Sequence, residues 1–457
     1  MGTEGAAPWS VLRKDDEQRS LLNSLEATSS ERIIDPCIYR VPPILRKMNE
    51  EAYTPSLVSI GPFHRGNETL KPTQHLKFSY ANKFLMRTRQ QNSVDDYARA
   101  VRDWEDEIRR RYYESIPMGR DEFVEMILMD GCFIIELFVS VFLEITSKSN
   151  GGTYLLTKRW PVGFDIMRDL ILLENQIPFF VLEGLFNLAF PNGLNDKISF
   201  HELAFENLSP SFKPTIYSPN SKMCKKFSYS YFVDHHLTLP NGDRLQVEHL
   251  CDMLRAFYVP SNPPTIVRGS NHKVKCSCTA NQLHEAGLKF EVHQDRGIFE
   301  LECSEGVFKM PLIRINVMTE IMLRNLVAFE QCHHNFEKYY VTNHMFLLYN
   351  LIKTGKDVEI LVEKGIMENF LGDNNDVATM IIKLSQQVVF AGINTNYGNL
   401  YVKLDEFYNN PYHKYKANFV REYWSTPWKR VSLFGGILLL SLTLIQTICS
   451  IISLFKK

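Results

Sequence analysis

The sequence has no excess of either charge, which excludes several classes of protein. Its 457 residues include 51 Lys and Arg against 52 Asp and Glu, so the formal net charge is -1 at pH 7. We therefore expect no nucleic-acid partner, because nucleic-acid-binding domains usually carry a positive excess. With 45% hydrophobic residues, the chain is also too apolar for a disordered polyelectrolyte.

Cysteines are few, and the chain begins without an apolar run. The nine cysteines are an odd number and form no dense framework of the kind found in small secreted domains. Residues 1–30 lack the apolar stretch of a signal peptide and are predicted to form a loose polar tail. Both observations favour a reducing compartment.

Familiar catalytic motifs are also missing. The sequence contains no GxSxG nucleophile elbow, HExxH zinc motif, Walker A loop or GxGxxG phosphate loop. An enzyme is only partly excluded, because catalytic groups are often assembled from distant segments. We predict no cofactor.

Two clusters contain metal-binding residue types. Four zinc-type ligands occur within thirteen residues: His272, Cys276, Cys278 and His284. Their spacing is not that of a zinc finger, and the cluster runs into a predicted helix end, so we interpret it as coincidental. The second cluster consists of Cys332, His333 and His334. It follows an amphipathic helical pattern, which favours structural histidines. We predict no metal site.

The longest apolar run lies near the end of the sequence. Residues 431–455 contain no charge, and as a helix they would be about 37 Å long against about 30 Å of hydrocarbon. Aromatic and basic residues typical of membrane interfaces flank this run: Trp424, Trp428, Lys429, Arg430, Lys456 and Lys457. We predict a membrane anchor over 425–457 with a transmembrane helix at 431–455.

The flanking charges predict an orientation. Five basic residues precede the run and two follow it: Lys414, Lys416, Arg421, Lys429 and Arg430 against Lys456 and Lys457. This bias favours a single-pass, tail-anchored protein in the plasma membrane or an endomembrane, with its N-terminal body in the cytosol. A body on the other side would offer the sequons at Asn67 and Asn207 for glycosylation. Ser432 and Gly436 form a small-xxx-small pair, which suggests a homo-oligomer as a further possibility.

The remaining pattern predicts a mainly α fold with a small antiparallel β insert (α+β). Prolines between residues 36 and 62 predict an extended segment. Helical periodicity follows Ser93, which forms a capping box with Asp96, and two apolar stretches at 123–145 and 164–186 are predicted as central helices. Short β-prone stretches near 286–313 predict an antiparallel meander, and helical patterns then return at 323–336, 343–352, 376–389 and 401–424. We expect one large domain over 31–424.

Acids within the two apolar stretches are the best candidate site. Asp130, Glu136, Asp169 and Glu174 are expected to be buried, and buried carboxylates need partners or shifted pKa values. They could converge as an acid/base or metal site, or Arg168 and Arg324 could simply neutralise them. His64 follows a Gly-Pro turn, where it is either displayed for function or packed against the first helix.

Several phrases together resemble a plant family known as domain of unknown function 247. They are CIYRVP (37–42), SIGPFHRG (59–66), MDGCFIIEL (129–137), DLILLENQIPFFVLE (169–183), AGLKF (286–290), LRNLVAFEQC (323–332) and YWSTPW (423–428). The resemblance implies a plant membrane protein with one large helical domain and a C-terminal transmembrane helix. Some grass members of the family are implicated in pollen self-incompatibility, and no catalytic residues are established.

These observations lead to one hypothesis and one alternative. The hypothesis is a membrane-tethered, non-enzymatic module that binds other proteins, whose identity the sequence does not specify, in recognition or signalling. The alternative is an enzyme that uses Asp130, Glu136, Asp169 and Glu174 on a membrane-proximal substrate.

Overall fold

The computed structural model describes residues 35–147, 160–195, 197–216, 228–237, 246–257, 278–293, 301–333, 338–390, 393, 395–419, 422 and 427–455. Within these ranges the protein is mostly helical and has two small sheets, which confirms the prediction of a mainly helical chain. The predicted polar tail, residues 1–30, lies outside the described residues.

The N-terminal half contains helices and short helical turns in the order α2 (Pro43–Arg46), η1 (Glu50–Tyr53), η2 (Glu68–Thr73), α3 (Gln74–Thr88), α4 (Val94–Arg110), α5 (Arg120–Ser147), α7 (Trp160–Leu170), α8 (Phe179–Ala189), α9 (Phe200–Ile216), α11 (Tyr229–Phe232) and η3 (Val233–Leu237). The C-terminal half contains α12 (Leu250–Ala256), α13 (Ala280–Glu285), β1 (Lys289–Val292), β2 (Glu302–Ser304), β3 (Val307–Met310), β4 (Ile313–Ile315), α14 (Val317–His333), α15 (Tyr340–Leu351), α16 (Gly355–Glu363), β5 (Met367–Asn369), α17 (Asn374–Ser385), α18 (Thr395–Asn409), α19 (Pro411–Phe419) and α20 (Pro427–Phe455).

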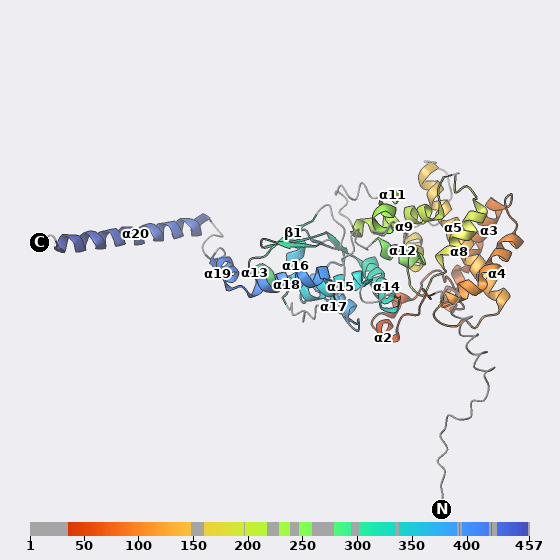
Figure 1. Ribbon diagram of the computed structural model, residues 1–457, viewed down its shortest axis with the longest axis horizontal. Helices are drawn as coiled ribbons and strands as arrows, with labels where there is room; N and C mark the ends of the chain where they lie inside the picture. Colours follow the sequence, from red (N-terminus) through yellow and green to blue (C-terminus); the bar gives the residue numbers. More distant parts are fainter. Residues whose placement is uncertain are drawn as a thin grey trace, which may run out of the picture.

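The molecule is elongated (Figure 1). Helices α3, α4, α5 and α8 form the end of the body farthest from α20, whereas α13, α18 and α19 lie at the end from which α20 projects. Most buried apolar side chains nevertheless belong to one continuous cluster that includes Cys37 and Leu404. One hydrophobic core therefore joins the two ends.

Helix α4 forms as its sequence predicts. Ser93 Oγ accepts a hydrogen bond from the Asp96 N–H, and the Asp96 carboxylate accepts one from the Ser93 N–H, which completes the predicted capping box. Tyr97, Val101 and Ile108 are fully buried on the face of the helix that packs against α5 and α8. One acid, Glu105, is buried on the same face and pairs with Arg109 and Arg120.

The second apolar stretch is not one helix. Helix α7 ends at Leu170 and α8 starts at Phe179, so the prediction of a continuous helix over 164–186 was wrong. Two amides explain the break, because Asn175 donates to the Asp169 carbonyl and Gln176 donates to the Leu170 carbonyl. These bonds satisfy carbonyls that a helix end leaves without partners. Pro178, which precedes α8 and lacks an N–H, also prevents a continuous helix.

The proline-rich segment is extended as predicted and lies over the core. Between residues 35 and 66 it contains only the short turns α2 and η1. Its apolar side chains, including Val41 and Tyr53, form a second buried cluster with Leu172, Leu173 and Phe329 of α14. The segment therefore covers the break between α7 and α8.

The β insert is mixed rather than an antiparallel meander. Strands β2 and β3 pair in an antiparallel hairpin whose turn has left-handed backbone at Glu305 and Gly306. Strand β1, however, pairs parallel to β3, so the strand order is β1-β3-β2. Strands β4 and β5 form a separate parallel pair. Short apolar strands carry no signal for their direction of pairing, which long-range packing decides here.

Two described helices are long and apolar enough to cross a membrane, and burial separates them. Within Arg120–Glu144 of α5, 72% of an apolar 18-residue window is buried inside the body, whereas within Pro427–Cys449 of α20 the buried share is 0%. Helix α5 is therefore a core helix, as predicted. The first turn of α20 carries Trp428, Lys429 and Arg430. Trp424, Lys456 and Lys457 lie outside the described residues, and the pairing of Ser432 and Gly436 in a homo-oligomer stays a prediction.

Candidate functional site

All four predicted acids are buried, and each has its own set of donors. Asp130, Glu136, Asp169 and Glu174 are at most 2% exposed. Three of them accept hydrogen bonds from backbone N–H groups of the extended segment, which has few backbone partners of its own. We call these three acids, together with Asn175, the carboxylate clamp.

Asp169 binds the segment at three consecutive residues. Its Oδ2 accepts hydrogen bonds from the N–H groups of Leu57 (2.7 Å) and Val58 (2.9 Å), and its Oδ1 accepts one from Ser56 (3.0 Å). Burial raises the pKa of Asp169, although these donors and the nearby Arg168 oppose that shift. The carboxylate thus replaces the partner strand that this stretch of backbone would otherwise need.

Asp130 holds the next part of the segment. Its Oδ2 accepts a hydrogen bond from the Gly61 N–H (2.7 Å), and its Oδ1 pairs with the Lys77 ammonium of α3. Burial raises the pKa of Asp130, and Lys77 acts in the opposite direction. Between the two acids, Asn175 accepts a hydrogen bond from the Ile60 N–H (2.7 Å).

Gly61 is required at its position. Its φ of 68° is left-handed, and a Cβ atom there would lie 2.5 Å from the Gln176 carbonyl oxygen. The segment therefore approaches the α7–α8 break closely enough that only glycine fits.

Glu136 lies apart from the clamp. It forms a two-pronged ion pair with Arg87 of α3, with both N–O distances at 2.9 Å, and also contacts Lys83 and Ser140. These contacts join α5 to α3. The charge of Glu136 is therefore matched by neighbouring cations.

Glu174 is the clamp residue that lines an open pocket. Its Oε1 accepts from the Val41 N–H (2.7 Å), and its Oε2 lies 2.5 Å from Arg46 Nη2 and 3.2 Å from His64 Nε2. Burial raises the pKa of Glu174, but the donors from His64, Arg46 and Val41 outweigh it and hold the pKa at about 2. Glu174 is therefore ionised at neutral pH.

The pocket beside Glu174 has a volume of about 590 Å³. Aromatic and basic residues contribute to its lining, among them Tyr39, Arg40, Arg46 and Tyr113. The Tyr39 and Tyr113 rings lie 5.6 Å apart, and Tyr113 is 70% exposed. We call this feature the Glu174 pocket.

The side chain of His64 is turned inward. It is 10% exposed and lies beside Glu174, so it is not displayed to solvent. Arg168 and Arg324, which the sequence offered as partners for the buried acids, differ in their contacts. Arg168 lies close enough to oppose the raised pKa of Asp169, whereas Arg324 pairs with Glu320 at 2.8 Å.

The two clusters of cysteine and histidine lie only partly within the described residues. Among the described residues, no group of three or more His, Cys, Asp or Glu side chains is placed to hold a metal ion. His272, Cys276 and His334 lie outside those residues. His333 lies 3.1 Å from the Pro36 carbonyl, and burial raises the pKa of the Cys332 thiol to about 11. Cys332 is thus a poor nucleophile at neutral pH.

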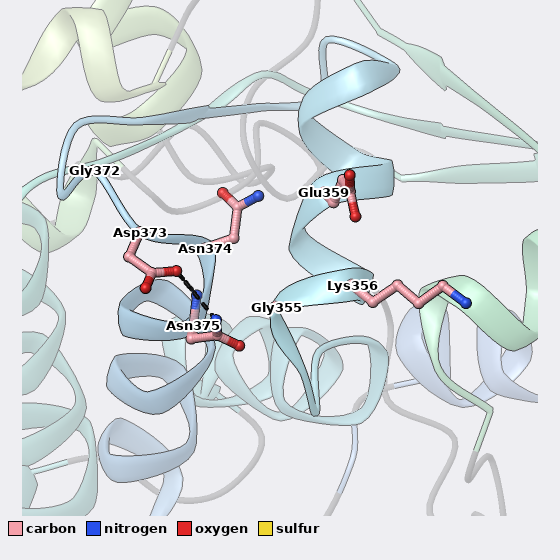
Figure 2. A pocket seen from close by; sticks show the side chains of 7 residues that line it. All are labelled: Gly355, Lys356, Glu359, Gly372, Asp373, Asn374 and Asn375. Atoms are coloured by element: carbon pink, nitrogen blue, oxygen red, sulfur yellow. Dashed lines mark hydrogen bonds between the residues drawn. The ribbon is translucent and has the colours of Figure 1, made fainter.

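A second hollow, of about 600 Å³, lies between the first turns of α16 and α17 (Figure 2). Figure 2 shows Lys356 and Glu359 on the α16 side and Asp373 on the α17 side. The Asp373 carboxylate accepts a hydrogen bond from the Asn375 N–H (2.8 Å). Helix N-termini attract anions, but the carboxylates of Glu359 and Asp373 repel them. The hollow is therefore poorly suited to an anionic ligand.

Sequence reasoning missed three buried amides in and near the clamp. Besides Asn175 and Gln176, Asn325 of α14 accepts a hydrogen bond from the Leu173 N–H (2.9 Å) and donates to the Ala52 carbonyl (2.8 Å). The available signal was a polar amide inside an otherwise apolar run, which is costly unless it has partners.

Comparison with known proteins identifies the family of the chain. A family model described as a plant protein of unknown function, domain of unknown function 247, matches residues 38–442. The chain belongs to this family. It is 27% identical over 444 residues to UPF0481 protein At3g47200 of Arabidopsis thaliana, which covers 91% of the chain and 86% of the relative. A second Arabidopsis thaliana UPF0481 protein, At3g02645, is 24% identical over 530 residues, covering 97% of the chain and 96% of the relative. No solved structure matches the chain.

Two of the phrases that resemble domain of unknown function 247 meet at the clamp. In SIGPFHRG, the Ile60 N–H donates to Asn175 of LLENQIPFF, and His64 lies beside Glu174 of the same phrase. In this chain, therefore, phrases of the family far apart in the sequence bind each other directly.

Proposed function

We propose that the protein is a membrane-tethered, non-enzymatic module whose helical body binds a protein partner. The main support for the membrane tether comes from α20. Its apolar segment Pro427–Cys449 is 0% buried and projects from the body (Figure 1). Its 29 residues would be about 43 Å long, more than the roughly 30 Å of a bilayer's hydrocarbon. In water such a helix would expose a large apolar surface.

The proposed orientation has the helical body on the cytosolic side of the membrane. Lys429 and Arg430 in the first turn of α20, together with Lys414 and Lys416 of α19, place positive charge on the body side of the helix. Positive charge is retained on the cytosolic side of membrane proteins. The membrane proposed is the plasma membrane or an endomembrane.

The surface proposed for the partner is the Glu174 pocket. Tyrosine and arginine contribute most to the centres of protein interfaces, and Tyr39, Tyr113 and Arg40 surround this pocket. Arg40 pairs with Glu114 at 2.9 Å while its guanidinium lies 4.4 Å from the Phe63 ring centroid, so its position is set before a partner binds. A preorganised surface binds with a smaller entropy cost.

The four acids support binding over catalysis. Asp130, Glu136 and Asp169 already have cations or backbone donors, as structural buried carboxylates require. The alternative of an enzyme draws its support from Glu174, which is ionised and lines an open pocket. In that case Glu174→Gln should abolish turnover in an untargeted metabolite and lipid screen, while the non-enzymatic proposal expects no turnover to abolish.

Carbonate extraction of plant membranes tests the tether. The full-length chain should stay in the membrane pellet, and the double variant Leu439→Arg, Leu442→Arg should move to the soluble fraction, because arginine at the centre of a spanning helix costs about 3 kcal/mol. Val317→Arg, at a residue of α14 that is 62% exposed, is the control and should stay in the pellet. A wild-type chain released by carbonate would refute the tether.

Glycosylation tests the orientation. The Asn67 sequon is the useful reporter, because the Asn207 amide donates to the Phe138 and Leu203 carbonyls of the folded body. A cytosolic body predicts no change in mobility on endoglycosidase treatment of the full-length chain. A mobility shift that disappears in Asn67→Gln would place the body on the other side.

Chemical cross-linking in plant cells tests the binding surface. We expect Tyr113→Ala to lose a cross-linked partner that the wild type retains. Phe370→Ala, which removes an aromatic ring that is 63% exposed on another part of the body, should keep it. Identical cross-linked species in both variants would refute the Glu174 pocket as the interface.

A further inference from the structure

Helix α19 is short and lies just before α20. It spans Pro411–Phe419, and none of its side chains is buried. Three aromatic residues on it are exposed: Tyr412 is 66% exposed, Tyr415 74% and Phe419 48%. Because a helix turns by about 100° per residue, these positions fall within an arc of about 60°. The helix therefore has one exposed aromatic face.

The opposite face of α19 packs against the body. The His413 ring stacks on Phe407 of α18, with 4.1 Å between centroids and an interplanar angle of 16°. The Lys414 ammonium lies 3.9 Å from the Tyr408 ring centroid. Ala417 lies against Gly287, where a Cβ atom would be 3.1 Å from the Ala417 Cβ. These contacts fix the rotation of α19, so its aromatic face points away from the body.

The chain keeps this face close to α20. Seven residues, 420–426, separate the end of α19 from the start of α20, and even fully extended they span at most about 30 Å. If α20 enters a bilayer, α19 therefore lies within about 30 Å of its surface and can reach it. Exposed tyrosine and phenylalanine are favoured at the level of the headgroups, where an aromatic ring is partly in contact with lipid.

The charges near α19 match an anionic surface. Lys414 and Lys416 lie on α19, and Arg421, Lys429 and Arg430 follow. One acid, Glu422, lies between Phe419 and Pro427. Clusters of basic residues beside a spanning helix are attracted to anionic headgroups.

We propose that α19 lies on the membrane surface, with Tyr412, Tyr415 and Phe419 inserted among the headgroups of anionic lipids. Because His413 and Ala417 bind the body at the same time, α19 would hold the body at a set angle to the bilayer rather than leave it on a free tether. This inference rests on the proposed membrane tether, and its test separates the two.

Photo-cross-linking of the full-length chain in lipid vesicles tests whether α19 lies on the membrane surface. The photoreactive amino acid benzoylphenylalanine replaces one aromatic residue at a time, at position 415, at position 428 or at position 78. Trp428 in α20 reports on the tether. Phe78 is the matched control, because it is an exposed aromatic residue (51%) on α3, and α3 lies at the end of the body farthest from α20.

The expected result in vesicles of phosphatidylcholine and phosphatidylserine is a lipid adduct at positions 415 and 428, several-fold above that at position 78. An adduct at 428 without one at 415 would overturn the surface role of α19 and leave the tether intact. No adduct at 428 would refute the tether itself. Vesicles of phosphatidylcholine alone should lower the yield at 415 several-fold but not at 428, and equal yields at 415 in both vesicles would overturn the role of anionic lipid.

Discussion

Glu174 and Arg46 form an ion pair with 2.5 Å between Oε2 and Nη2, although 128 residues separate them in the sequence. The pair connects α2 to the break between α7 and α8, and Val41 adds a backbone hydrogen bond to the same carboxylate. Three of the four acids that drew attention as candidate catalytic groups, Asp130, Asp169 and Glu174, thus anchor an extended segment to the helical core.

Removing a clamp carboxylate should destabilise the body. Asp130→Ala leaves the half-buried Lys77 ammonium without its counter-charge and the Gly61 N–H without its acceptor, so we expect the free energy of unfolding to fall by about 3 kcal/mol. Glu125→Ala, at an exposed acid on the same helix, should change it by less than about 0.5 kcal/mol. Urea unfolding of the full-length chain in detergent, followed by circular dichroism, measures both. A folded, equally stable but inactive Asp130→Ala protein would instead favour the enzyme alternative.

Asp169→Asn should release part of the extended segment. The variant replaces one carboxylate oxygen with an N–H₂ group and removes the charge that three backbone donors bind, a loss of about 2 kcal/mol. Hydrogen exchange should become faster at Ser56, Leu57 and Val58. Asp165→Asn, one turn earlier on α7, is the comparison and should leave exchange there unchanged. Unaltered protection in Asp169→Asn would argue against the clamp.

Alanine substitutions at two glycines compare the cost of a left-handed backbone with the cost of a steric clash. Gly61 and Gly66 both have left-handed φ values, 68° and 83°, but only at Gly61 would a Cβ atom collide, at 2.5 Å from the Gln176 carbonyl oxygen. Gly66→Ala should cost about 1 kcal/mol for its backbone conformation, and Gly61→Ala should cost at least about 2 kcal/mol more. Equal losses in urea unfolding would show that the segment does not approach the α7–α8 break this closely.

Acidification should destabilise the body through His249. The His249 Nε2 lies 3.0 Å from the Cys37 carbonyl, and its Nδ1 accepts a hydrogen bond from the Asp252 N–H. Protonation of the neutral ring would therefore place a proton on Nδ1, which points at the N–H of Asp252. Burial lowers the pKa of His249 from 6.5 to about 4.

A lowered histidine pKa means that this contribution to stability is present above pH 6.5 and is lost as the pH falls toward 4. The loss amounts to about 3 kcal/mol. Urea midpoints measured between pH 7 and pH 4 should fall, and His249→Gln should show a weaker pH dependence. An unchanged slope in the variant would assign the acid sensitivity to other groups, such as His344, whose pKa burial lowers to about 3.

Local features of the sequence determined much of the fold. The capping box at Ser93 and the apolar stripe of Tyr97, Val101 and Ile108 predicted α4, because a helix start and a buried face depend on residues within a few turns. The prolines predicted the extended segment for the same reason. The acids within 123–145 and the absence of charge from 431–455 also separated the core helix α5 from the exposed helix α20, because a charged side chain is costly in lipid.

The tertiary structure alone decided the partners of the acids and the direction of the strands. The sequence predicted that Asp130, Asp169 and Glu174 are buried, because they lie in apolar runs. It did not predict that their partners are backbone N–H groups of an extended segment more than sixty residues earlier in the chain. Every residue except proline offers the same N–H donor, so no side-chain pattern marks which backbone groups a carboxylate will bind. That pairing exists only once the segment has been laid across the α7–α8 break.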